Sequence, residues 1–274
     1  MSAVTKFLPK NHVSFFIGWL VHWPLPRFFW TPIIRLFAHQ YAIDLNEAEF
    51  PVDQYPSLGE FFIRRLKPGV RPLAETKVVH PADSVVTQSY RIQSGKLVQA
   101  KDKYYSAVEL TADPNAFEKY EGGFFLTYYL CPTDYHRVHS PVTGFIKKIT
   151  HIPGKLWPVN NWSTENVAEL FSVNERVCVE IETVQGFVNV VFVGATNVGQ
   201  IELFVDSEIR GNQFVISKPL IKDGLNISVQ KGQELGCFRM GSTVVALYGK
   251  SFEVDDQKFK ALQNQAVRVN SAFF

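Results

Sequence analysis

Three short stretches of the 274-residue sequence contain the side chains best suited to acid–base or nucleophilic chemistry. They hold Asp83 in "HPADS", His136 and His139 in "DYHRVHSP", and Ser242 in "MGST". An aspartate, a histidine and a serine from separate segments can form a relay, in which the imidazole takes the hydroxyl proton and the carboxylate fixes the imidazole tautomer. The order of the three along the chain does not exclude such a triad, because convergent triads occur in several orders.

Each of these groups also has an ordinary structural explanation when it is taken alone. Asp83 follows Pro-Ala and is a typical turn former. His136 and His139 are three residues apart, so on a strand they face opposite sides and make a poor pair of metal ligands. We therefore expect no metal site. The tripeptide from Gly241 to Thr243 is common in turns, and the absence of a G-x-S-x-G motif gives no support to a nucleophile elbow of the α/β-hydrolase kind.

The composition is that of a folded globular protein, with 46% hydrophobic and 20% charged residues and no low-complexity run. A formal net charge of +2 gives no overall field for nucleic acid, so we expect no nucleic-acid partner. Cys131, Cys178 and Cys237 lack CxxC spacing, which argues against a disulfide scaffold and a zinc ribbon and favours a reducing compartment.

Aromatic residues are concentrated in the first forty positions. The run "NHVSFFIGWLVHWPLP" (11–26) has no charged residue, but it is shorter than the roughly 20 residues of a spanning helix and contains two prolines. It also lacks the small residues of a secretory cleavage site. The following segment places Ile33, Phe37 and Tyr41 at helical spacing beside Arg27 and Arg35, which is typical of a helix in a bilayer interface. A helix pair packed on the protein's own core is the alternative.

Beyond residue 51 the pattern changes to one short helix, expected within 56–69, followed mainly by strands. The strands are expected at residues 77–79, 85–92, 123–130, 144–152, 176–181, 187–193, 200–204, 237–240 and 244–248. The segment 105–123 is expected to be a helical or irregular interruption. The sequence therefore predicts an α+β protein with a β-rich, barrel-like or sandwich-like domain.

Three patterns, "HPADSVVTQ", "HSPVTGFIKKI" and "QKGQELGCF", also resemble the hammerhead-like barrels of lipoyl carriers and sugar-phosphotransferase domains. A carrier in which His136 or His139 holds a phosphoryl group is thus one alternative. A serine hydrolase that uses Asp83, His139 and Ser242 on an external ester is another.

Taken together and in chain order, the stretches resemble phosphatidylserine decarboxylase of the prokaryotic type, a pyruvoyl-dependent enzyme. The resemblance covers roughly residues 45–248 and runs through "SLGEFFIRRLKPGVRP", "HPADS", "YLCPTDYHRVHSPVTG", "PGKLWPVN", "LFSVNERV", "VGATNVGQIE" and "KGQELGCFRMGSTVV". Two positions depart from the family pattern, because Met240 replaces the usual Leu and Ser84 replaces the usual Gly. Neither departure removes a reacting group.

The resemblance implies that the chain cuts its own Gly241–Ser242 bond, giving a large chain (1–241) and a small chain (242–274). It implies that His139 deprotonates Ser242, that Asp83 orients His139, and that Ser242 becomes a covalent pyruvoyl group. That group would form a Schiff base with the substrate amine and accept the electrons released with CO2, giving phosphatidylethanolamine. His136 is the candidate for positioning or protonation in this step, and Thr243 is a weaker candidate.

Because the implied substrate is a diacyl lipid, the resemblance favours membrane docking for the aromatic N-terminal segment. We expect residues 1–50 to be the docking helices and residues 51–274 the catalytic domain of a protein peripheral to the cytoplasmic face of a bacterial cell membrane. Arg27, Arg35, Arg64 and Arg65 would each add about 1 kcal/mol on an anionic surface. A pyruvoyl decarboxylase of a soluble amino acid is disfavoured by the same segment, and the sequence leaves open whether the protein is a homo-oligomer.

Overall fold

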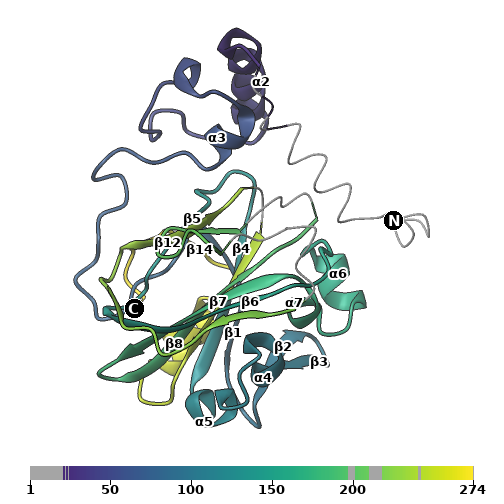
Figure 1. Ribbon diagram of the computed structural model, residues 1–274, viewed down its shortest axis with the longest axis vertical. Coiled ribbons are helices and arrows are strands. Elements are labelled where there is room, and N and C mark those ends of the chain that lie inside the picture. The colour runs from purple at the N-terminus through teal and green to yellow at the C-terminus, as the bar shows by residue number, and fades with distance from the viewer. Residues whose placement is uncertain are drawn as a thin grey trace.

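The structure is a computed structural model that describes residues 21, 23, 25–196, 201–209, 218–239 and 242–273, with residue 242 described for its backbone only. Most of the charge-free run before residue 27, together with Gln200, Met240 and Gly241, lies outside the described residues. The chain forms a large twisted antiparallel sheet, with helices on one face and a small helical layer beyond one end of the strands (Figure 1). The prediction of an α+β fold is confirmed.

The main sheet has the strand order β10-β6-β7-β8-β13-β4-β1-β14, and β11 also pairs with β6. Its strands are β1 (Ser84–Arg91), β4 (Phe124–Leu130), β6 (Gly144–Ile152), β7 (Arg176–Thr183), β8 (Gly186–Val193), β10 (Leu220–Lys222), β11 (Ile227–Val229), β13 (Ser242–Tyr248) and β14 (Ala266–Val267). A three-stranded sheet combines β5 (Arg137–His139), β12 (Glu234–Phe238) and β9 (Ile201–Leu203), and a hairpin combines β2 (Lys96–Ala100) and β3 (Lys103–Ser106). Within the described residues this strand order is open and does not close into a barrel.

The helices are short apart from α2. They are α2 (Arg27–Gln40), α3 (Leu58–Phe62), α4 (Ala107–Thr111), α5 (Ala116–Tyr120), α6 (Asn161–Asn166), α7 (Leu170–Val173) and α8 (Asp256–Ala261), together with a 3-10 turn, η2 (Val52–Gln54). The expected helix within 56–69 is therefore only five residues long, capped where the Ser57 hydroxyl accepts a hydrogen bond from the Glu60 amide. Within the described residues, no helix combines the length and apolar character needed to cross a bilayer.

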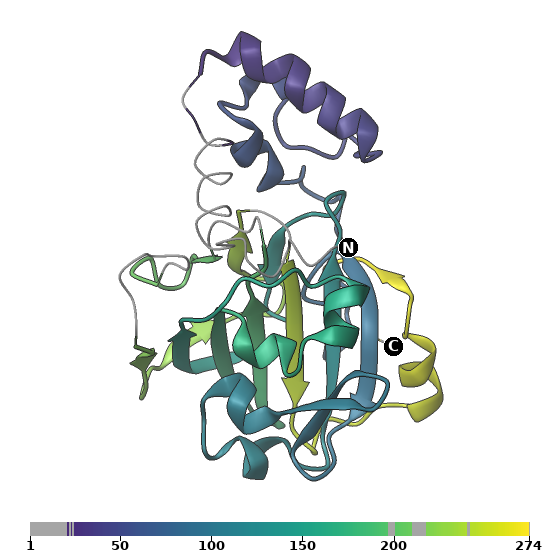
Figure 2. The same ribbon diagram turned by 90° about the vertical axis from the view of Figure 1, so that its right-hand side faces the viewer.

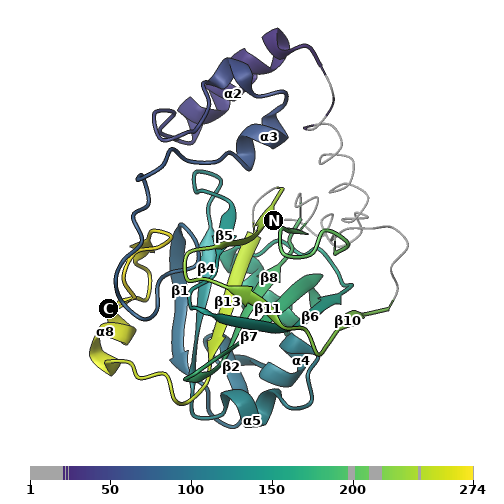
Figure 3. The same cartoon turned by 60° about the vertical axis from the view of Figure 1, so that its left-hand side comes forward.

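Strand β13 lies in the main sheet between β8 and β4 (Figure 3), and residues 243–248 are buried on both of its faces. Because successive side chains of a strand point to opposite faces, Val244 and Ala246 enter one hydrophobic core while Val245 and Leu247 enter the second. The second core is covered by α4 and α7, and Figure 2 shows the helices in front of this face of the sheet. Backbone pairing fixes β13 on both sides from Thr243 onward, and residue 242 pairs with Leu130 of β4.

The helical layer at the N-terminal side packs around α2. Trp30, Ile34 and Ala38 form its buried row, whereas Phe28 and Leu36 are each 69% exposed. The row expected to face a bilayer, Ile33, Phe37 and Tyr41, is at most partly covered, since the buried contacts with Tyr55 and Phe61 fall on the adjacent row.

Several other elements differ from expectation. Residues 77–79 form only an isolated bridge from Val79 to Ala272, and the segment 105–123 contains the end of β3 with α4 and α5. The sequence patterns did not predict several short elements, namely the strands β2, β5, β10, β11 and β14 and the helices α6 and α7.

Candidate active site

His139 lies at the end of β5, in a position fixed by both backbone and ring contacts. Its amide donates to the Pro81 carbonyl at 2.8 Å, two residues before Asp83. The ring Nδ1 is 2.7 Å from the Gly232 carbonyl and Nε2 is 3.2 Å from the Tyr135 hydroxyl. A carbonyl oxygen only accepts, so Nδ1 carries the hydrogen and the neutral ring keeps its lone pair on Nε2.

The groups around His139 have opposing effects on its pKa. Burial lowers the pKa of His139, while the bond to Gly232 and the carboxylate of Glu234 act to raise it. The guanidinium of Arg137 lowers the same pKa, and the charge of Asp83 raises it from a greater distance. A neutral imidazole with its lone pair on Nε2 is the protonation state that a general base requires.

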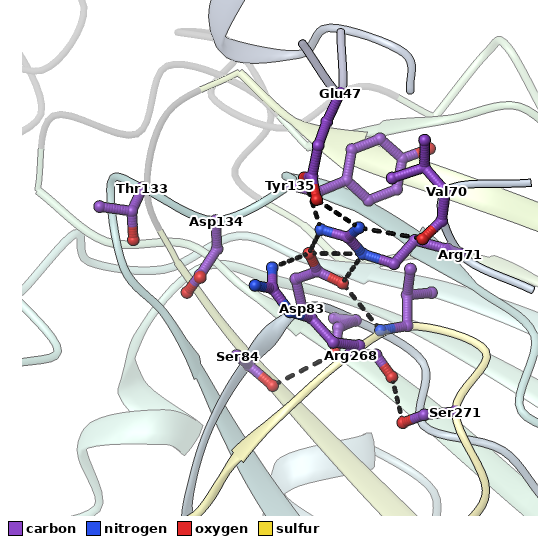
Figure 4. A network of polar contacts seen from close by, with 12 residues as sticks. Glu47, Val70, Arg71, Asp83, Ser84, Thr133, Asp134, Tyr135, Arg268 and Ser271 are labelled. Atoms are coloured by element: carbon purple, nitrogen blue, oxygen red, sulfur yellow. Dashed lines mark hydrogen bonds and ion pairs between the residues drawn. The ribbon is translucent and has the colours of Figure 1, made fainter. Parts of the chain in front are cut away.

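Asp83 is almost fully buried and its carboxylate is held by several donors (Figure 4). Arg71 donates from Nε to both oxygens at 3.1 and 3.0 Å and from Nη2 to Oδ2 at 2.6 Å. Arg268 Nη1 lies 3.1 Å from Oδ2 and the Val269 amide donates to Oδ1 at 2.8 Å. Arg71 also forms a two-bond pair with Glu47, at 3.1 and 2.9 Å.

These contacts bear on the expectation that Asp83 orients His139. Among the described residues Asp83 and His139 share no hydrogen bond, because the Asp83 oxygens face Arg71, Arg268 and Val269. The Gly232 carbonyl is the group that fixes the His139 tautomer here. Ser84, the departure beside Asp83, donates its hydroxyl to the Ala82 carbonyl at 3.3 Å and begins β1 without disturbing the pairing.

His136 is fully buried just before β5. Its carbonyl accepts from the Phe238 amide at 3.0 Å, and its ring packs on Phe62 of α3 with 4.0 Å between centroids. Nδ1 is 2.8 Å from the Asp134 carbonyl, whereas Nε2 has no hydrogen-bond partner among the described residues. Burial lowers the pKa of His136 to about 3, so the ring is neutral near pH 7. A buried, unpaired nitrogen is costly in a purely structural role, which favours a functional one.

Residue 242 begins β13 opposite Leu130, the last residue of β4. The segment that follows β4 leads directly to His136 and His139, so both histidines come from the chain that leaves the partner strand beside residue 242. Thr243 pairs with Tyr129 on one side and Val193 on the other, and lines a cavity of about 410 Å³ with Gln88 and Trp162 among its other walls. Gly241, on the other side of the expected cleavage bond, lies outside the described residues.

Sequence reasoning missed four polar residues around these groups, Arg71, Arg268, Tyr135 and Glu234. The partners of Arg71, Arg268 and Glu234 near the site lie 12 to 185 positions away in the chain, and Tyr135 lies four residues before His139, at a spacing that carries no signal of its own. The adjacency of Tyr135 to "HRVH" was the available clue. In the part of the chain that the structure describes, no group of three or more His, Cys, Asp or Glu side chains could hold a metal ion.

Arg64 corrects one of our expectations. It was expected to meet lipid head groups, but it is only 5% exposed and donates from Nη2 to the Thr133 carbonyl at 3.2 Å. Its guanidinium lies 5.1 Å from the centre of the Phe61 ring. The residue is buried because α3 ends beside it and packs against the active-site loop, whereas Arg27, Arg35 and Arg65 are exposed.

A family model described as phosphatidylserine decarboxylase matches residues 58–274, which contain Asp83, both histidines and Ser242. The match places the chain among the carboxy-lyases. The chain is 42% identical over 249 residues to the phosphatidylserine decarboxylase proenzyme of Anaeromyxobacter sp. (strain K), covering 90% of this chain and 88% of the relative. It is 40% identical over 265 residues to that of Myxococcus xanthus (strain DK1622), covering 96% and 92%. The proenzyme of Shewanella loihica is 39% identical over 255 residues, covering 90% and 89%. The chain belongs to the phosphatidylserine decarboxylase family.

Proposed function

We propose that this protein converts phosphatidylserine to phosphatidylethanolamine with a pyruvoyl group that it makes from Ser242 by cutting the Gly241–Ser242 bond. The observation that carries the proposal is the approach of β4 and β13. Leu130 pairs with residue 242, and the chain leaving Leu130 brings in His136 and His139. The family match and the proenzyme names of the relatives support the same reaction.

The residues present fit a pyruvoyl group at position 242. The strand that would carry it is paired on both sides from Thr243 onward, so a new chain end at 242 would be anchored by the sheet. The buried Nε2 of His136 is unpaired among the described residues and is a polar atom suited to a substrate contact. When present, the group supplies an electron sink for the electrons left behind as CO2 departs.

In self-cleavage, His139 is the base. Its Nε2 lone pair takes the proton of the Ser242 hydroxyl, and the Gly232 carbonyl holds Nδ1–H so that the ring presents Nε2. Asp83 contributes negative charge that favours the protonated imidazole, while the direct contact with His139 remains a prediction for the reacting state. His136 positions the substrate in the decarboxylation step, because its neutral ring holds Nδ1–H at the Asp134 carbonyl and presents Nε2 as an acceptor.

The N-terminal layer is the proposed membrane contact, with residues 1–50 as the docking part and residues 51–274 as the catalytic part. Phe28, Phe29, Ile33 and Leu36 of α2 are exposed, and a cavity of about 560 Å³ lies between Arg27, Arg35 and nearby residues. Exposed apolar side chains beside cations suit an anionic bilayer surface. This arrangement supports a peripheral membrane position, which we propose to be the cytoplasmic face of a bacterial cell membrane.

The intact mass of each polypeptide under denaturing conditions tests the proposal. The wild-type protein should give two chains divided between residues 241 and 242, with the small chain beginning in a pyruvoyl group. Ser242→Ala should give one chain without decarboxylase activity, whereas Ser251→Ala, at an exposed serine in the same C-terminal part, should mature normally. An active sample that consists of one unbroken chain with an ordinary serine would refute the proposal and favour the hydrolase or carrier alternative.

A further inference from the structure

The Tyr135 hydroxyl lies between two acceptors. It is 3.2 Å from His139 Nε2 and 3.3 Å from Glu234 Oε1, and the tyrosine is 4% exposed. A phenol has one hydrogen, so it can donate to only one of the two at a time. A tyrosine that only filled space would need no hydrogen bond to either His139 or Glu234, so the presence of both acceptors points to a further role.

The two protonation states of His139 require opposite arrangements of this hydroxyl. While the ring is neutral, Nδ1 donates to Gly232 and Nε2 accepts, so Tyr135 donates to His139. Once Nε2 is protonated it becomes a donor, and Tyr135 must accept from it and give its own hydrogen to Glu234. Rotation about the C–O bond of the phenol makes this change without moving a heavier atom.

The charges around the ring favour the second arrangement when a proton arrives. Glu234 on β12 and Asp83 before β1 are negative, whereas Arg137 on β5 is positive. Arg137 donates to Glu234 Oε2 at 2.8 Å and to the Ile63 carbonyl at 2.9 Å, which holds the carboxylate with Oε1 toward Tyr135. Tyr135 is mostly removed from water, and its hydroxyl lies 3.3 Å from the carboxylate oxygen to which it can donate.

We propose that Tyr135 and Glu234 are positioning residues for His139, in which the tyrosine hydroxyl turns from His139 to Glu234 as the imidazole becomes protonated. The inference rests on the proposed function, in which Nε2 takes the Ser242 proton. In that step the serine O–H bond breaks and an Nε2–H bond forms. Tyr135 keeps its own hydrogen throughout and only redirects it, so no net proton reaches Glu234. The tyrosine thus holds the neutral ring before the step, and the pair stabilises the charge of the imidazolium afterward.

Proton titration of the His139 ring by NMR tests the inference in the non-cleaving Ser242→Ala protein. Glu234→Gln and Tyr135→Phe should each move the His139 midpoint to lower pH, because each removes a partner of the protonated ring. Combining them should give less than the sum of the two shifts, since Glu234 acts partly through the tyrosine. The seven histidines are distinguished with a His139→Gln reference.

Matched controls separate this role from general effects on folding. Glu202→Gln removes a carboxylate that pairs with Arg239 in the same three-stranded sheet and has a side-chain exposure of 28%, against 27% for Glu234. Tyr90→Phe removes a hydroxyl that accepts from Gln263 at 3.1 Å. Neither control should move the His139 midpoint.

In the chain with Ser242 intact, Tyr135→Phe and Glu234→Gln should slow self-cleavage about tenfold, a fraction of the 10²–10⁴-fold that a general base contributes. The loss should persist toward higher pH, because a lowered midpoint leaves His139 already neutral there and the variants are limited by a weaker base rather than by a protonated one. An unchanged His139 midpoint in both variants overturns the inference whether or not the wild type cleaves itself. Absence of cleavage in the wild type would instead overturn the proposed function. The titration would still test whether Tyr135 and Glu234 set the pKa of His139.

Discussion

Replacing Asp83 with asparagine should destabilise the fold by about 3 kcal/mol, in addition to slowing self-cleavage. The carboxylate is 1% exposed and is paired to Arg71, whose side chain is 10% exposed. Removing one partner of a buried ion pair costs about 3–5 kcal/mol, because the other charge is left uncompensated. The lower end applies, since Arg71 keeps its pair with Glu47 and an asparagine oxygen can still accept from the Val269 amide. Arg268 adds little, because its side chain is 62% exposed.

Urea unfolding in the Ser242→Ala background measures this loss without interference from chain cleavage. The urea midpoint should fall while the slope against denaturant stays the same, which identifies a change in stability rather than in compactness. Asp256→Asn is the matched control, because Asp256 pairs with Arg91 at 2.6 Å but has a side chain 63% exposed. The control should lose under about 1 kcal/mol. If Asp83→Asn loses no more than Asp256→Asn, the view that Asp83 is a buried structural anchor is wrong.

Two further predictions follow from burial and exposure. Burial lowers the pKa of His80 to about 4 and of His136 to about 3, so unfolding takes up protons below the ordinary histidine pKa of about 6.5. The free energy of unfolding should therefore fall as pH drops from 6.5 to 4, by up to about 1.4 kcal/mol per pH unit for each ring. His80→Gln should make this fall shallower. An equal slope in the variant would contradict the lowered pKa of His80. On vesicles containing phosphatidylserine, Phe28→Ser and Leu36→Ser should each weaken flotation about tenfold or more, because burying such a side chain contributes about 1.5–3 kcal/mol. Ile221→Ser, at an exposed residue of β10, should leave flotation unchanged, and equal losses in all three would place the contact elsewhere.

Local patterns predicted those parts of the structure whose cause is local. Strand β13 appears where a run of apolar residues follows the Gly-Ser-Thr step, and its neighbours in the sheet are similarly apolar. The buried face of α2 could not be predicted from the sequence, because the helix has apolar residues on two adjacent rows. Only the tertiary contacts of Trp30, Ile34 and Ala38 with the following segment decide which row is buried.

The sequence likewise predicted only part of the candidate site. Asp83, His136 and His139 could be selected from motifs, but the partners of each side chain could not. Arg71 reaches both Asp83 and Glu47, which lies 24 positions earlier, and no pattern in "GVRP" records those distances. The hydrogen bond from His139 to the Gly232 carbonyl was equally hidden, because a backbone acceptor leaves no trace in residue type.

The placement of β13 and β14 has a consequence for the matured protein. The segment after residue 241 supplies a strand held between β8 and β4, another strand on β1, and Phe273 in the first core. Severing the backbone before residue 242 would thus leave two polypeptides interlocked through shared hydrophobic interior, and simple dilution should not part them. Gel filtration would return one species for cut and uncut material alike, and the two pieces should melt in a single transition.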